Sequence, residues 1–137
     1  MSLGELLSTL LSACQGLDRS VFSNLQVSIS APKDLRKYHH QIRNAVYNAC
    51  KQAGLSHYGC EIFSTFVARR VAGGFSYIRH NQQVGYECEC VFDDIVPENL
   101  KGKCFSQQSD WSFLSCNLCE IQDAFRAAYA IAVSVKN

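Results

Sequence analysis

The strongest alternation of apolar and polar residues in the chain is the segment VGYECECVF, residues 84–92. In a β-strand successive side chains point to opposite faces, so one face of this strand would carry Val84, Tyr86, Cys88, Cys90 and Phe92. A shorter alternating run predicts a further strand at Leu25–Ser30, and we expect two more strands at Cys60–Ala68 and Phe75–Arg79. Turn formers separate the last three strands along the chain, Gly73–Gly74 at the first turn and Asn81–Gln83 at the second, so we expect these three to form an antiparallel meander.

Helical periodicity and capping residues predict three helices. The first follows the capping signature Ser2–Glu5 and carries a stripe of leucines. The second runs from Leu35 to Gly54, after a proline that suits a first helical turn. The third begins at Asn117–Glu120 and is apolar on several sides. We therefore expect the third helix to be buried on more than one face or to cover a second copy in a homodimer.

This order of elements predicts an α+β fold, with the helices packed on one face of a mainly antiparallel sheet. A chain of 137 residues suits one domain, residues 1–137. The order helix, three strands, helix also occurs in double-stranded-RNA-binding domains. The basic start of their final helix is absent here, because Cys116–Asp123 contains no lysine or arginine.

Charge is distributed unevenly along the chain, although the net charge is only +1. Residues 1–81 carry nine Lys and Arg against four Asp and Glu, and residues 82–137 carry four against eight. Cations gather on the second helix, residues 33–54, and after the predicted strand that follows it. This candidate binding set is Lys33, Arg36, Lys37, His40, Arg43, Arg69 and Arg70. It fits either a solvated helix face or a nucleic-acid contact.

Eight cysteines are many for this length, and whether they form disulfides depends on the cellular compartment in which the protein works. The apolar N-terminal segment has no basic start, so we expect no secretory signal. No apolar run reaches the roughly 18 residues that a membrane-spanning helix needs. The sequence therefore predicts a reducing intracellular compartment, with thiols that are free or bound to metal.

Two short cysteine pairs could supply four thiolates to a structural zinc ion: Cys88 with Cys90, and Cys116 with Cys119. Cys104 or His80 could replace one ligand. However, a regular strand separates the sulfurs of a Cys-x-Cys pair by about 7 Å, so buried cysteines without metal are the alternative. The second pair precedes a predicted helix, where a thiol can also become redox-active.

No motif of a known catalytic class is present, neither a P-loop, nor GxSxG, nor HExxH, nor a zinc-deaminase signature. The sequence therefore favours binding over catalysis. We expect a small intracellular protein that binds another protein as an adaptor, inhibitor or subunit. The alternatives are a nucleic-acid contact through helix 33–54 and a zinc or thiol-redox protein centred on Cys116 and Cys119.

Overall fold

The computed structural model of the chain describes residues 1–73, 92–107 and 110–136. Within these ranges the regular structure is helical, and the only β-type pairing is an isolated antiparallel bridge between Ser2 and Ser28. The predicted α+β fold is therefore wrong. The α-helices are α1 (Leu3–Leu10), α2 (His39–Gln52), α3 (His57–Ala72), α5 (Ser112–Cys116) and α6 (Leu118–Ser134). The 3₁₀ helices are η1 (Arg19–Asn24), η2 (Pro32–Tyr38), η3 (Glu98–Leu100) and η4 (Phe105–Gln107).

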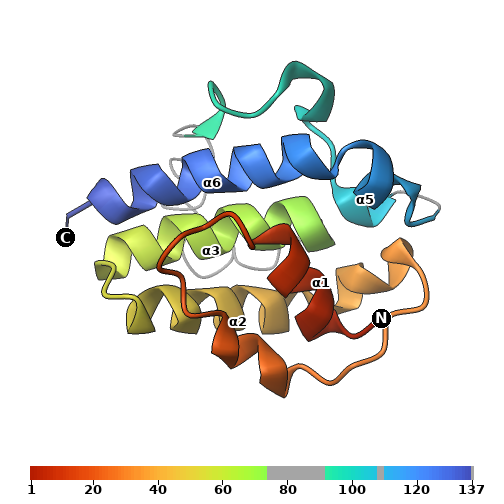
Figure 1. Cartoon of the computed structure of the whole chain (residues 1–137), viewed down its shortest axis with the longest axis horizontal. Coiled ribbons are helices and arrows are strands. Elements are labelled where there is room, and N and C mark those ends of the chain that lie inside the picture. The colour runs from red at the N-terminus through yellow and green to blue at the C-terminus, as the bar shows by residue number, and fades with distance from the viewer. Residues whose placement is uncertain (74–91, 108–109, 137) are drawn as a thin grey trace.

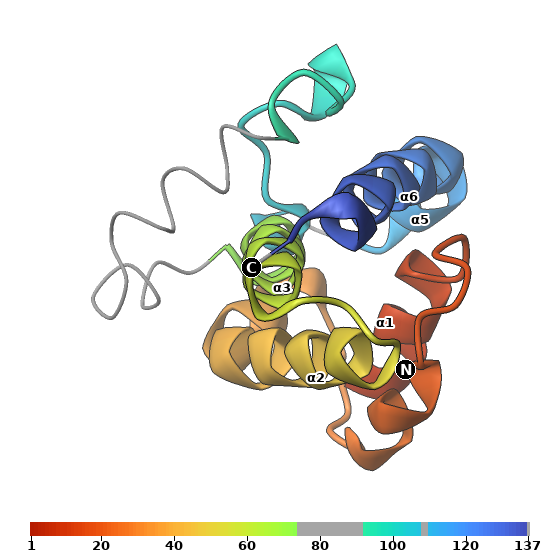
Figure 2. The same ribbon diagram turned by 90° about the vertical axis from the view of Figure 1, so that its left-hand side faces the viewer.

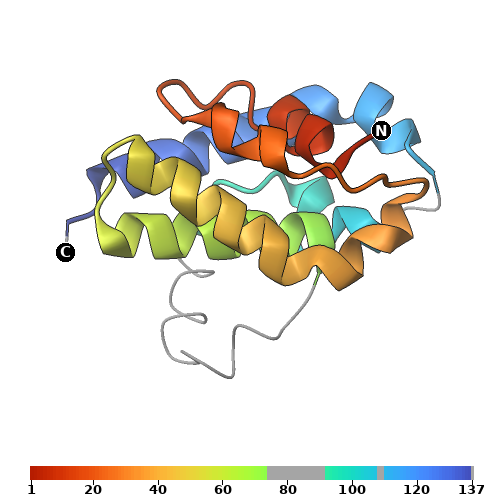
Figure 3. The same cartoon turned by 90° about the horizontal axis from the view of Figure 1, so that it is seen from below.

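Helix α3 is the centre of the molecule. It lies between α2 and α6 (Figure 1), and the view along α3 shows these neighbours on different sides of it, with α2 crossing it obliquely (Figure 2). On another side, α1 and η1 pack together beside α2 (Figure 3). A helix surrounded in this way must be apolar on most of its circumference.

The burial pattern of α3 explains why the predicted strand Cys60–Ala68 is wrong. All of residues 62–68 are buried, so the segment has no polar stripe from which a helical period could be recognised. The true signals lie at its ends. Ser56 caps the first turn, and Gly73 ends the helix in the left-handed conformation with φ = 67°. Gly73 is a helix C-cap here and not the hairpin turn that the predicted meander required.

The predicted strand Leu25–Ser30 is also wrong, although its alternation is physically real. Ile29 is buried, and the segment is extended alongside the start of α1. Its carbonyl oxygens accept hydrogen bonds from the first amides of that helix, Leu3 N to Val27 O at 2.8 Å and Gly4 N to Leu25 O at 3.1 Å. The extended segment thus satisfies helix-end donors that would otherwise lack partners. Phe75–Arg79 and residues 84–91 of the fourth predicted strand lie outside the described residues.

The three predicted helices are present, with differences at their ends. Ser2 caps α1 by accepting from Glu5 N at 3.1 Å. The second helix begins as η2 before it becomes α2, and Gly54 follows it with φ = 92°. Asn117 occupies the N-cap position of α6 but forms no side-chain capping bond.

Helix α6 is buried on the sides that face α1 and α3, as its apolar sequence predicts. Tyr129 is buried, whereas Val133 on the outer side is 54% exposed. The outer side also carries the ion pair between Arg126 and Asp123, at 3.0 Å. The predicted homodimer through this helix stays a prediction.

Aromatic rings join α3, α6 and the segment before η3 into one core. The ring of Phe66 lies 4.7 Å from that of Phe92 and 5.8 Å from that of Phe125, measured between centroids. Phe63 meets Tyr129 edge to face at 5.3 Å. Such pairs add roughly 0.5–1.5 kcal/mol each beyond the area that they bury.

Candidate functional site

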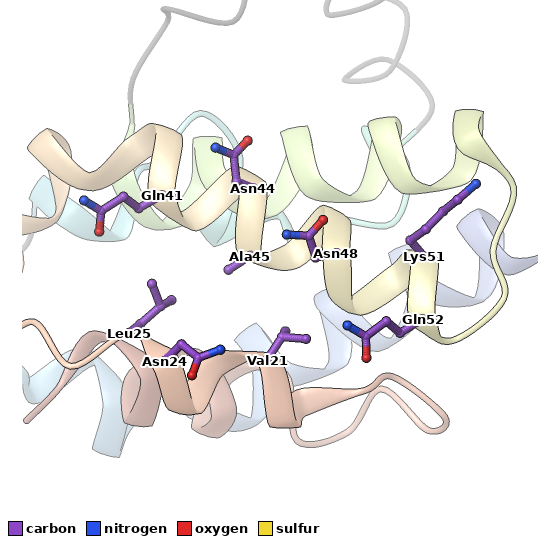
Figure 4. A pocket seen from close by; sticks show the side chains of 9 residues that line it. All are labelled: Val21, Asn24, Leu25, Gln41, Asn44, Ala45, Asn48, Lys51 and Gln52. Carbon is purple, nitrogen blue, oxygen red and sulfur yellow. The ribbon is translucent and has the colours of Figure 1, made fainter.

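An open groove of about 620 Å³ lies between α2 and η1 (Figure 4). Val21 and Leu25 project into it from the η1 side, opposite Ala45 of α2. We call it the carboxamide groove, because five side-chain amides and one lysine complete its lining: Asn24, Gln41, Asn44, Asn48, Gln52 and Lys51. All six of these residues are exposed.

The carboxamides of α2 share one face because of their spacing. Gln41, Asn44, Asn48 and Gln52 follow one another at intervals of three or four residues, which places them in a row along the helix. Asn44 and Lys51 project from the edge of α2 that faces away from η1 (Figure 4). None of the five carboxamides hydrogen-bonds through its side chain to another described residue. Their donors and acceptors are therefore available to a ligand.

The other edge of α2 packs against α3 and pairs polar side chains across the two helices. Tyr47 Oη lies 2.7 Å from His57 Nδ1, and Arg43 Nη1 lies 3.5 Å from Glu61 Oε2. Arg43 precedes Tyr47 by four residues on α2, whereas its partner Glu61 follows His57 by four residues on α3. This is the register of two antiparallel helices. These contacts pair side chains of α2 with side chains of α3, so this edge leaves fewer polar groups for a partner than the groove does, although Arg43 Nε is buried without a hydrogen-bond partner among the described residues.

Part of the predicted cationic set is brought together at the start of α2 and the end of α3. His40, Arg43 and Arg69 all lie close enough to the buried His39 to disfavour its protonation. Burial is the larger cause, and together these effects lower the pKa of His39 from 6.5 to about 4. His39 is therefore a neutral core residue at physiological pH.

The remaining cations of the predicted set differ in exposure. Arg70 is only 7% exposed, and its guanidinium carbon lies 5.3 Å from the centre of the Phe66 ring. Lys37 extends over the ring of Tyr38, with its Nζ 5.4 Å from the ring centre. Lys33 and Arg36 are exposed on η2. The set thus lies on η2, α2 and α3, which contact one another, and a nucleic-acid contact through it stays a prediction.

Three cysteines are buried in the core, from different parts of the chain. Burial raises the pKa of Cys14 to about 12 and also raises the pKa values of Cys50 and Cys60. Tyr129 lies near all three, and its pKa rises to about 12, mainly through burial and then through these thiols. Protonated thiols are poor nucleophiles and poor metal ligands. We therefore assign Cys14, Cys50 and Cys60 to packing.

The cysteines of the predicted metal site are only partly described. Cys116 and Cys119 are exposed around the start of α6, and Cys104 is half-buried. Cys88, Cys90 and His80 lie outside the described residues. Within the described ranges no three His, Cys, Asp or Glu side chains are grouped so that they could hold a metal ion. Zinc at Cys88, Cys90, Cys116 and Cys119 therefore stays a prediction.

The carboxamide groove was missed from the sequence, although a signal for it exists. Asn and Gln recur along one face of the second helix, but the predicted binding surface was built on the cations of the same helix. The contribution of η1 could not be anticipated, because residues 19–24 carry no clear period.

Comparison of the chain with protein-family models, with curated proteins and with solved structures gives no match. In the described part of the chain, no helix combines the length and the apolar character needed to cross a membrane.

Proposed function

We propose that the protein acts by binding another protein, as an adaptor, inhibitor or subunit, and that the carboxamide groove is its contact surface. The observation that carries this proposal is a row of four carboxamides on α2, faced by Asn24 of η1 and set beside an apolar floor. None of the five has a side-chain hydrogen-bond partner in the described structure. Apolar contact supplies affinity, and unused donors and acceptors supply specificity.

The chemistry of the groove favours binding over catalysis and protein over nucleic acid. Among the described residues that line it, Lys51 is the only titratable one, whereas acid–base and nucleophilic catalysis need paired groups. Nucleic acid needs several cations for its phosphates and often aromatic rings for its bases. The groove has one lysine and no aromatic residue.

Site-specific photo-crosslinking tests the proposal in the full-length chain. We expect a photoreactive amino acid in place of Asn48 to give a discrete adduct with another protein in the cells that produce this chain. The matched control replaces Gln107, an exposed carboxamide on η4 that lies outside the groove. Absence of an adduct from position 48, or an equal adduct from position 107, would contradict the proposal.

A second variant separates loss of contact from loss of fold. Asn44→Ala combined with Asn48→Ala removes two carboxamides, and alanine favours an exposed helix by some tenths of a kcal/mol per residue. We therefore expect thermal stability to be kept or slightly raised while an adduct from a photoreactive residue at position 52 weakens. Gln107→Ala should leave that adduct unchanged.

A further inference from the structure

We infer that the carboxamide groove takes its partner as an extended segment of polypeptide, about five residues long, recognised through its main chain and anchored by an acidic group at Lys51. The inference rests on the proposed function, and it names the chemical class of the partner. It follows from the hydrogen-bonding groups, the length and the charge of the groove.

The hydrogen-bonding groups match those of a peptide backbone. A carboxamide presents one carbonyl and one NH₂ group, and a peptide unit presents one carbonyl and one N–H. A row of Asn and Gln side chains can therefore accept from and donate to successive peptide units. The described part of the chain has no strand whose edge could pair with a partner, so these side chains must do this work.

The length of the groove sets the length of the segment. Gln41 and Gln52 are eleven positions apart, which corresponds to about 17 Å along an α-helix. An extended chain advances about 3.3 Å per residue, so about five residues fit beside α2. Side chains of the segment that face inward would meet Val21, Leu25 and Ala45, which form the apolar floor.

Lys51 lines one end of the groove, and its side chain brings a positive charge to that end from the edge of α2 that faces away from η1 (Figure 4). Residues 39–52 contain no Asp or Glu, and Lys51 forms no ion pair with a described residue. A carboxylate of the partner, either from an acidic side chain or from a chain terminus, would be attracted to this end. The charge thus fixes the direction in which the segment lies, because the carboxamides alone do not distinguish it.

The test uses a display library of random seven-residue peptides, selected on the full-length chain. We expect enrichment of peptides with an acidic residue near one end, and weaker binding of these peptides to the Asn44→Ala, Asn48→Ala variant and to Lys51→Ala. Lys103→Ala, at an exposed lysine outside the groove, is the matched control and should bind as the wild type does.

Methylation of peptide nitrogens then distinguishes main-chain from side-chain recognition. Each N-methyl group removes a donor, so methylation at central positions should weaken a selected peptide about tenfold. Replacing the acid of the peptide by its amide should weaken binding to the wild type but leave binding to Lys51→Ala unchanged. Synthetic peptides and isothermal titration give these values.

Three results would overturn the inference. They are failure to enrich any peptide, unchanged affinity after N-methylation, and displacement of a selected peptide by ten-nucleotide poly(U), which would indicate a nucleic-acid groove. If peptides fail while the crosslink from position 48 forms, only the inference falls. If both fail, the proposed function falls with it.

Discussion

At the scale of single residues, three of the six described cysteines are buried, two are exposed, and Cys104 is intermediate. We predict that iodoacetamide at pH 8 labels Cys116 and Cys119 in the native protein. Cys14, Cys50 and Cys60 should stay unlabelled until denaturant is added, because burial keeps them protonated and covered. Peptide mass spectrometry at successive times measures this order. Equal labelling rates for the two groups would contradict the described core.

His39 makes the free energy of unfolding decrease as the pH falls below neutrality. The unfolded chain protonates this histidine as the pH falls through 6.5, whereas the folded chain does so only near its pKa of about 4. Between these values the unfolded state binds more protons, so the free energy of unfolding decreases as the pH falls and levels off below 4. The effect is on the order of 1–3 kcal/mol.

The substitution His39→Gln isolates this contribution. We expect the wild type to lose more stability than the variant between pH 7 and pH 4.5, whatever the difference between them at pH 7. Urea unfolding curves at the two pH values supply the comparison. Equal losses in the two proteins would show that His39 protonates normally in the folded state.

At the scale of elements, one serine joins the start of α3 to the end of α6. Ser56 Oγ accepts from Gly59 N at 3.0 Å and donates to Val135 O at 2.9 Å. We predict that Ser56→Ala lowers the free energy of unfolding by about 1–3 kcal/mol, because it removes a cap and an interhelical bond. Ser2→Ala, which removes a cap alone, should cost less. Chemical denaturation compares the two variants, and the reverse order would contradict the described bond.

Sequence patterns predicted the helices α1 and α2, which have one wet face, and failed for α3, whose central residues are all buried. The leucine stripe of α1 and the amphipathic α2 were recognisable because polar residues mark their exposed sides. Residues 62–68 of α3 are buried all round, so aromatic and β-branched residues there resembled a strand. Ser56 and Gly73 are end signals of this helix, but they predict it only if the residues between them are interpreted with a helical period.

The candidate site shows the same limit. The face of α2 could be derived from spacing alone, since Asn44, Asn48 and Gln52 recur at helical intervals. The opposite side of the groove is formed by η1, which contacts α2 although the 3₁₀ helix η2 separates the two in the sequence. This tertiary contact could not be derived from spacing. The pairing of Arg43 with Glu61 is likewise a tertiary event, and it neutralises a cation that the sequence presented as available.

At the scale of the whole molecule, the net charge of +1 gives little field to attract a polyanion. We predict that short RNA or DNA duplexes bind with dissociation constants above about 10 μM at physiological salt, within the usual nonspecific range. Fluorescence anisotropy over a salt series measures this. Submicromolar binding that Arg36→Glu with Lys37→Glu abolishes would show that the cations of η2 and α2 form a nucleic-acid surface.

The first and last helices are in contact. Gln122 Nε2 of α6 donates to Thr9 O of α1 at 2.9 Å and to Ser12 Oγ, just after α1, at 2.8 Å. Helix α3 also packs closely on α6, because a Cβ added at Gly59 would lie only 2.5 Å from Ala132 O. During synthesis on the ribosome, α1 and α3 therefore emerge long before the helix that covers them. The nascent chain exposes apolar faces throughout this interval, so a chaperone that holds such faces should associate with it until α6 is released and closes the core.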